Sequence, residues 1–164
     1  MVKVLIAYSG GGKTAKIKTD IINHYYGDDE IGRDVYIIER EDYSEYSRVF
    51  NLDYFKIIKP SSDMSFFDDV RDSDIYIDCE CMEDEFMSNV LGIIKNAKTR
   101  KNNVVITFLD IERSKYQRAI FEYADEVLVG KCDLLTEQIL EAIFSQKIRP
   151  QQTRYEFRKL GGKK

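Results

Sequence analysis

The chain has 164 residues, of which 43% are hydrophobic and 33% are charged. This balance excludes a disordered chain, and the length fits one domain with a sizeable core. No apolar stretch approaches the roughly 18–20 residues of a membrane-spanning helix, and the N-terminal residues lack the pattern of a cleavable secretion signal, so we expect a cytoplasmic protein.

Strands and helices are predicted to alternate along the chain. In chain order we expect a strand at Val2–Tyr8, a helix at Lys13–Tyr26, strands at Asp34–Glu39 and Tyr54–Ile58, a helix at Asp63–Arg71, a strand at Asp74–Asp78, a helix at Glu83–Lys98, a strand at Asn103–Leu109, a helix at Lys115–Tyr123, a strand at Glu126–Val129 and a helix at Leu135–Phe144. The strand cores are apolar on both faces, which is typical of a parallel sheet that is covered on both sides. The predicted fold is therefore a three-layer α/β/α sandwich with a mainly parallel sheet.

Charge is unevenly distributed along this chain. Residues 147–164 hold seven basic side chains and one acidic side chain, a balance of +6, whereas the rest holds 18 basic and 28 acidic, a balance of −10. We therefore divide the chain into a folded domain, 1–146, and a basic C-terminal tail, 147–164. Such a tail can bind DNA, contact an acidic face of a neighbouring subunit, or remain solvated.

The three cysteines indicate no metal or redox site. Cys79 and Cys81 are two positions apart, which is not the C-x-x-C spacing of zinc and redox sites, and Cys132 is distant in sequence. His24 is the only histidine. We expect reduced thiols.

A glycine-rich segment joins the first predicted strand to the first helix. Ala7–Thr14, A-Y-S-G-G-G-K-T, fits the Walker A pattern if its first position accepts Ala as well as Gly. The glycines let successive backbone N–H groups point at one anion, and the helix that follows adds its partial positive charge. Lys13 is expected to reach the β- and γ-phosphates, and the Thr14 hydroxyl to bind Mg²⁺. The residues expected to bind the phosphates of ATP are Ser9, Gly10, Gly11, Gly12, Lys13, Thr14 and Ala15; the structural alternative is a glycine-rich turn without a ligand.

This segment, with the elements around it, resembles the P-loop NTPase superfamily over most of the first 130 residues. The resemblance implies Mg²⁺-dependent binding and hydrolysis of ATP. It also implies an acid at the end of a neighbouring strand, and I-Y-I-D-C-E, Ile75–Glu80, resembles this Walker B element with Asp78 as the Mg²⁺ partner. Glu80 is a candidate to polarise the attacking water, although Cys79 separates it from Asp78 and Glu83 is an alternative.

A second group of acids, Glu39, Glu41 and Asp42, follows the second predicted strand. In ParA/MinD-like ATPases an acid at this place helps to hold metal and water, but Tyr8 occupies the position of the signature lysine of that group. The other interpretation is a solvated loop at the end of the strand.

The strand Asn103–Leu109 is expected to lie beside the first strand, where Thr107 can sense the γ-phosphate. Arg113 and Arg118 follow it, and Arg113 is our candidate for neutralising charge in the transition state, in cis or from a neighbouring subunit. The alternative for each arginine is a solvated side chain at a helix start. The stretch Val104–Gly130 is similar to the C-terminal half of HerA/FtsK-like and Zot-like motor ATPases.

We therefore expect an oligomeric motor ATPase that translocates or packages DNA, with ATP and Mg²⁺ as cofactors. The alternatives are a ParA/MinD-like switch ATPase, a small-molecule phosphotransferase, and a nucleotide-binding module that does not hydrolyse.

Overall fold

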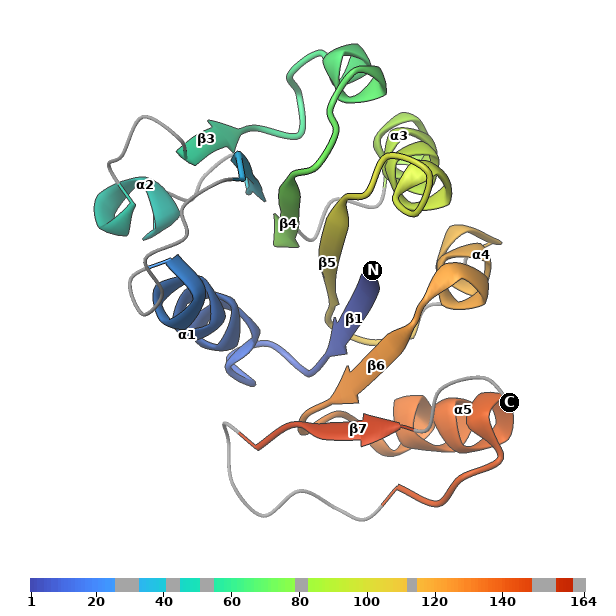
Figure 1. Cartoon of the computed structure of the whole chain (residues 1–164). Coiled ribbons are helices and arrows are strands. Elements are labelled where there is room, and N and C mark those ends of the chain that lie inside the picture. Colours follow the sequence, from blue (N-terminus) through green and yellow to red (C-terminus); the bar gives the residue numbers. More distant parts are fainter. Residues whose placement is uncertain are drawn as a thin grey trace.

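A single sheet organises the protein (Figure 1). The computed structural model describes residues 1–25, 33–40, 45–50, 55–78, 83–111, 115–148 and 156–160. Within these ranges the strands are β1 (Val2–Ile6), β2 (Val35–Glu39), β3 (Phe55–Ile58), β4 (Asp74–Asp78), β5 (Asn103–Phe108), β6 (Glu126–Val129) and β7 (Arg158–Leu160). Their order in the sheet is β3-β2-β4-β5-β1-β6-β7.

All described neighbours in this sheet are parallel except β6 and β7, which are antiparallel. Strand β1 lies between β5 and β6, so the predicted position of Asn103–Leu109 beside the first strand is confirmed. Strand β5 also separates β1 from β4. The carboxyl ends of the parallel strands meet at one edge of the sheet, and this is where ligands bind in open α/β folds.

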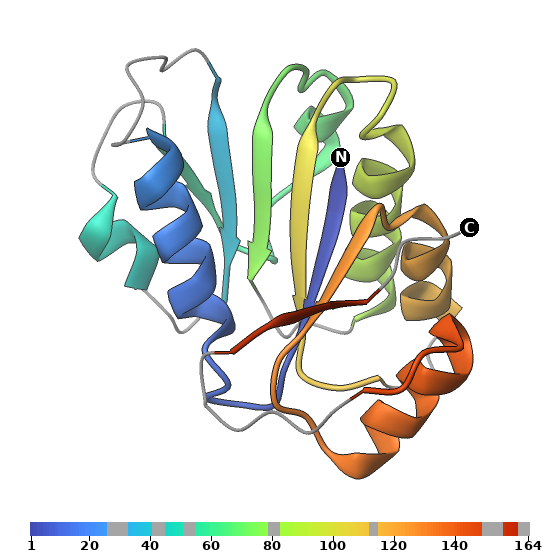
Figure 2. The same cartoon turned by 60° about the horizontal axis from the view of Figure 1, so that its bottom comes forward.

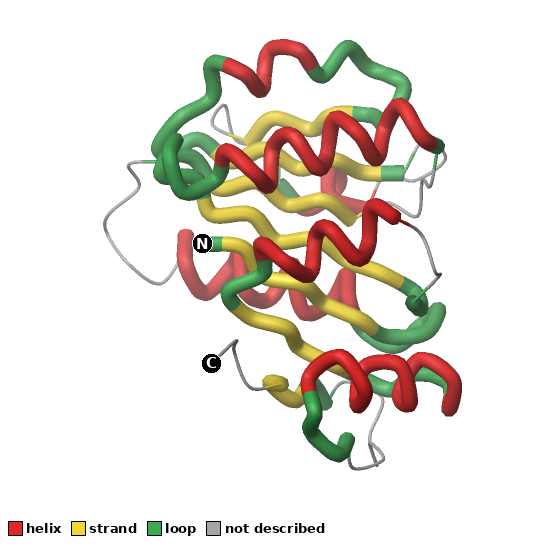
Figure 3. The backbone as a smooth tube through the Cα atoms, turned by 90° about the vertical axis from the view of Figure 1, so that its right-hand side faces the viewer, coloured by secondary structure: helices red, strands yellow, loops and turns green. Residues whose placement is uncertain are grey.

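Helices cover both faces of the sheet, which confirms the predicted three-layer sandwich (Figures 2 and 3). One face carries α1 (Lys13–Tyr25) and α2 (Glu45–Val49), and the other carries η1 (Ser65–Asp68), α3 (Asp84–Asn96) and α4 (Lys115–Tyr123); α5 (Leu134–Phe144) lies beside α4, near β6 and β7. None of the described helices is long and apolar enough to cross a membrane.

The hydrophobic core has one cluster on each face of the sheet. On the first face, Ile17, Ile21 and Tyr25 of α1 recur at four-residue spacing and pack with residues of β2 and α2. The larger cluster, on the other face, contains the buried hydrophobic residues of α3 and α4 and extends to Leu140 of α5 and Leu160 of β7. The helical periodicity of the sequence therefore identifies the buried faces of α1 and α3.

Three elements differ from the predictions. The short helix α2 was not predicted, and the predicted helix at Asp63–Arg71 is a single 3₁₀ turn at Ser65–Asp68. Strand β7 was also not predicted, because we took Glu126–Val129 as the last strand. Part of the basic C-terminal segment therefore belongs to the sheet, with Val127 paired to Leu160.

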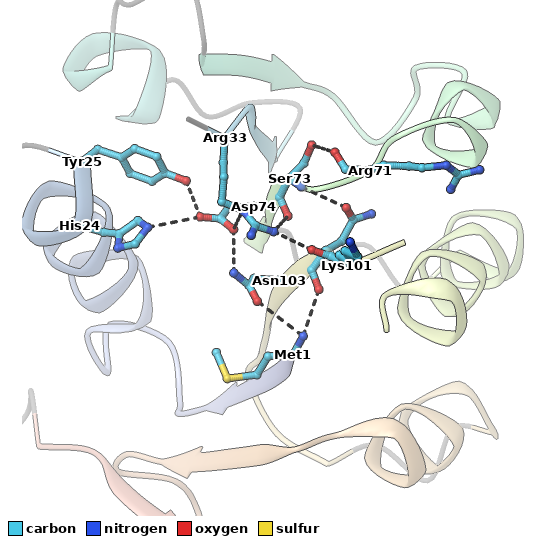
Figure 4. Close-up of polar contacts among 10 residues, drawn as sticks. Met1, His24, Tyr25, Arg33, Arg71, Ser73, Asp74, Lys101 and Asn103 are labelled. Atoms are coloured by element: carbon cyan, nitrogen blue, oxygen red, sulfur yellow. Dashed lines mark hydrogen bonds and ion pairs between the residues drawn. The ribbon is translucent and has the colours of Figure 1, made fainter. Parts of the chain in front are cut away.

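A buried carboxylate lies at the amino end of β4, on the edge of the sheet opposite to the end of β1 (Figure 4). Asp74 accepts hydrogen bonds from the Tyr25 hydroxyl and, at 2.9 Å, from the Asn103 side-chain amide. Arg33 forms an ion pair with it through Nε, 3.1 Å from Oδ1. Burial, followed by the contact with Asp74, raises the pKa of Tyr25, so this phenol remains a hydrogen-bond donor. These contacts join the end of α1 to the sheet.

Shortening Leu160 tests whether β7 belongs to the folded domain. The side chain of Leu160 is buried, so Leu160→Ala should lower the free energy of unfolding by about 2 kcal/mol or more, because it leaves a cavity beside Val127. The matched control is Leu135→Ala, the same change at an exposed leucine of α5, which should alter stability by less than about 0.5 kcal/mol. Denaturant unfolding measures both, and equal stability of the two variants would contradict a packed β7.

Candidate functional site

The predicted phosphate loop connects β1 to α1 at the carboxyl edge of the sheet (Figure 1). Gly10 and Gly12 have φ values of 71° and 89°, a left-handed backbone that residues with a Cβ adopt at a cost. Two backbone hydrogen bonds fix the start of the loop: the Ala7 N–H donates to the Phe108 carbonyl at the end of β5 at 3.1 Å, and the Tyr8 N–H donates to the Lys131 carbonyl, just after β6, at 2.9 Å. The backbone at Gly10 and Gly12 is therefore one that favours residues without a Cβ, whereas their contact with phosphate stays a prediction.

Ala7, at the first position of the loop, is fully buried and is accommodated by two glycines. A Cβ on Gly11 would lie 2.8 Å from the Ala7 Cβ and 2.8 Å from the Tyr8 carbonyl oxygen. A Cβ on Gly130, directly after β6, would lie 3.0 Å from the Ala7 Cβ. The absence of side chains at these two positions leaves room for a methyl group where many such loops have glycine.

Lys13 is folded back over the loop. Its Nζ donates to the Ala7 carbonyl at 2.6 Å and to the Tyr8 carbonyl at 3.2 Å, and only 7% of the residue is exposed. A phosphate bound to the loop would offer this ammonium group a charged acceptor, which makes a stronger hydrogen bond than a carbonyl. Ser9 and Ala15, which were also predicted to contact phosphate, are both exposed, Ser9 in the loop and Ala15 in the first turn of α1.

Asp78 ends β4 and accepts hydrogen bonds from three hydroxyl groups. The Thr14 hydroxyl donates to Oδ2 at 2.6 Å, and the Tyr46 hydroxyl donates to the same oxygen at 2.5 Å. The Thr107 hydroxyl, from β5, donates to Oδ1 at 2.9 Å. Sequence reasoning singled out Thr14, Asp78 and Thr107 separately, and in the structure Thr14 and Thr107 both contact Asp78.

Tyr46, in α2, is the residue of this group that sequence reasoning missed. Its side chain is fully buried, and burial, followed by the charge of Asp78, raises the pKa of its phenol above the ordinary value. The sequence contains only a weak signal for it, the apolar pair Tyr46 and Phe50 at i,i+4, whose rings stack with centroids 6.3 Å apart. A five-residue helix is too short for a periodic pattern to reveal.

Glu39, at the end of β2, is paired in register with Asp78. It is fully buried, so the interpretation as part of a solvated loop is wrong for this residue. Its Oε1 accepts the backbone N–H of Tyr46 at 3.1 Å, and its Oε2 lies 3.6 Å from Lys59 Nζ in an ion pair. This carboxylate thus binds the first turn of α2. The acids Glu41 and Asp42 lie outside the described residues.

Two predicted catalytic residues, Glu80 and Arg113, also lie outside the described residues, as do Cys79 and Cys81. Arg118 is an exposed residue of α4. Cys132 is partly buried, and burial raises the pKa of its thiol to about 12, so it remains a thiol at neutral pH.

The oxygen atoms beside the loop suit Mg²⁺ bound together with a nucleotide. Mg²⁺ prefers hard oxygen ligands and is usually held by one or two carboxylates plus substrate phosphates, rather than by a cage of protein ligands. Thr14 and Asp78 supply a hydroxyl and a carboxylate in contact with each other. Among the described residues no group of three or more His, Cys, Asp or Glu side chains gathers to form such a cage. The residues present therefore fit a cation that arrives with phosphates.

No protein-family model and no curated protein sequence matches the chain. Solved structures do match it in fold. The genome packaging NTPase B204 from Sulfolobus turreted icosahedral virus 2, in complex with ATP-gammaS, has a TM-score of 0.65 at 12% sequence identity, over 95% of this chain and 89% of that one. The DNA-packaging ATPase B204 from Sulfolobus Turreted Icosahedral Virus has a TM-score of 0.60 at 12% identity, over 86% and 80% of the two chains. This chain thus has the α/β fold of these packaging NTPase structures.

Proposed function

We propose that this chain binds ATP with Mg²⁺ at the loop Ala7–Thr14 and hydrolyses it. The observation that carries the proposal is the hydrogen bond of 2.6 Å between Thr14 and Asp78, directly beside a loop with two left-handed glycines. A bare glycine-rich turn needs neither a buried lysine nor a buried carboxylate at its side, because a buried charge is costly unless it has a task or a partner.

Each residue has a distinct role in the proposed reaction. The loop amides and the start of α1 bind phosphate oxygens, and Lys13 moves from the Ala7 carbonyl to the β- and γ-phosphates. Thr14 and Asp78 hold Mg²⁺, which, when bound, neutralises charge on the phosphates. Thr107, through Asp78 Oδ1, couples β5 to the same site. We keep Glu80 as the proposed residue that orients the attacking water and Arg113 as the proposed arginine for the transition state.

Removing the charge of Lys13 tests the proposed phosphate site. Lys13→Ala should weaken ATP binding at least about tenfold and abolish turnover, because the ammonium that meets the β- and γ-phosphates is lost. Lys16→Ala is the matched control: Lys16 lies one turn further along α1, where it forms an ion pair with Asp20. Calorimetric titration with ATP and a phosphate-release assay measure both variants. Wild-type turnover by Lys13→Ala would place the nucleotide elsewhere.

We further propose that the hydrolysis drives an oligomeric motor of the DNA-translocating or packaging type. Two observations support this function: the fold is similar to that of packaging NTPases over 80–89% of their chains, and residues 147–164 carry a net charge of +6. The switch-ATPase alternative depended on an acid after the second strand, and the described acid there, Glu39, holds α2 instead. The position of the signature lysine holds Tyr8, an exposed aromatic residue.

Neutralising the basic segment tests its contact with DNA. Truncation would also remove β7, so the better variant replaces five basic residues outside that strand with glutamine: Lys147, Arg149, Arg154, Lys163 and Lys164. The logarithm of the DNA-binding constant falls linearly with the logarithm of the salt concentration, and each phosphate contact that is lost should make this slope less steep by about 0.9. Fluorescence anisotropy with duplex DNA measures the slope. The control replaces two exposed lysines with glutamine, Lys95 in the last turn of α3 and Lys98 just after it. An unchanged slope in the five-residue variant would contradict DNA binding by this segment.

A further inference from the structure

Of the three hydroxyl groups that donate to the Asp78 carboxylate, the Tyr46 hydroxyl has no role in the proposed reaction. Thr14 is a proposed ligand of Mg²⁺ and Thr107 connects the carboxylate to β5, but Tyr46 comes from α2, which lies between β2 and β3 in the chain. The hydroxyls of Tyr46 and Thr14 both donate to Oδ2, so together they fill the acceptor sites of that oxygen. A carboxylate with donors on both oxygens has little freedom to rotate.

The backbone of Tyr46 is held as firmly as its hydroxyl. Glu39 accepts its backbone N–H at 3.1 Å, and the Tyr46 carbonyl accepts the N–H of Phe50 at 2.8 Å. The neighbouring Glu45 forms an ion pair with Lys18 of α1. A polar chain therefore runs from Lys59, through Glu39 and the first turn of α2, to Asp78.

We propose that Tyr46 is a positioning residue that orients the Asp78 carboxylate for Mg²⁺-dependent nucleotide binding and hydrolysis. The inference rests on the proposed function. When Thr14 turns its hydroxyl oxygen toward a cation, one donor to Oδ2 is weakened, and Tyr46 is then the donor that keeps this oxygen in place. Tyr46, for which the sequence predicted no role, thus orients the Asp78 carboxylate without itself being a proposed ligand of Mg²⁺.

The chain contains a matched control for this proposal. Tyr25 is also a buried phenol that donates to a buried aspartate of β4, but its partner Asp74 begins the strand, whereas Asp78 ends it (Figure 4). Tyr46→Phe and Tyr25→Phe remove the same hydroxyl from the same kind of environment and retain the ring. Both should lower stability, because each leaves a carboxylate with one donor fewer. Only Tyr46→Phe should alter the nucleotide site.

The main readout is binding, measured with the non-hydrolysable analogue AMPPCP in Mg²⁺ and in EDTA. We expect the wild type to bind more tightly with Mg²⁺, and Tyr46→Phe to reduce this gain by roughly tenfold while its affinity in EDTA stays within about twofold. Its kcat should fall by a similar factor. Tyr25→Phe should retain the Mg²⁺ gain and the kcat of the wild type.

The binding results distinguish the proposed function from the proposed role of Tyr46. A wild type that binds AMPPCP in neither buffer would overturn the proposed function. A wild type that shows the Mg²⁺ gain, with the same gain and kcat in Tyr46→Phe, would overturn only the role of Tyr46. The same loss in Tyr25→Phe would also overturn it, because general destabilisation would then explain both.

A second variant covers the case in which Tyr46→Phe does not fold. Glu39→Gln retains the Tyr46 hydroxyl and an acceptor for its N–H, but removes the charge that binds Lys59 and the first turn of α2. Glu39→Gln should also reduce the increase in AMPPCP affinity that Mg²⁺ causes, but by a smaller factor than Tyr46→Phe, about threefold. An unchanged gain in folded Glu39→Gln would overturn the proposal.

Discussion

The contact between the Thr14 hydroxyl and the Asp78 carboxylate is the interaction on which the proposed site depends. The two residues are far apart in sequence and come from α1 and β4, which are not successive elements. A parallel sheet brings them together because every strand then ends at the same edge, and β5 places Thr107 between the loop strand and β4. The order of the strands, more than any local motif, therefore creates the arrangement.

The proposed phosphate loop and the proposed metal site are stabilised in different ways. The loop depends on missing side chains, since Gly11 and Gly130 leave room for the Ala7 methyl group. The metal site depends on polar partners, because the buried carboxylate of Asp78 would be costly without its hydroxyl donors. In both cases the groups lie close together in the fold, so we expect binding to require little rearrangement beyond the movement of Lys13 and a turn of the Thr14 hydroxyl.

The sequence predicted the features that have a local cause. The glycines, Lys13 and Thr14 form a contiguous motif, and the buried faces of α1 and α3 follow from periodicity. Features that depend on tertiary contacts were missed: α2 and β7 are too short for a pattern, and Glu39 looked like a solvated loop residue because its partners, Tyr46 and Lys59, become neighbours only in the fold. Tyr46 was missed for the same reason.

A crystal structure of the chain with AMPPCP and Mg²⁺ tests the central claim most directly. The account predicts phosphates on the loop amides of Gly10–Lys13, Lys13 Nζ on the phosphates instead of the Ala7 carbonyl, and the cation beside Thr14 and Asp78. A nucleotide bound at another place, or a cation without contact to Thr14 or Asp78 directly or through its water, would contradict it.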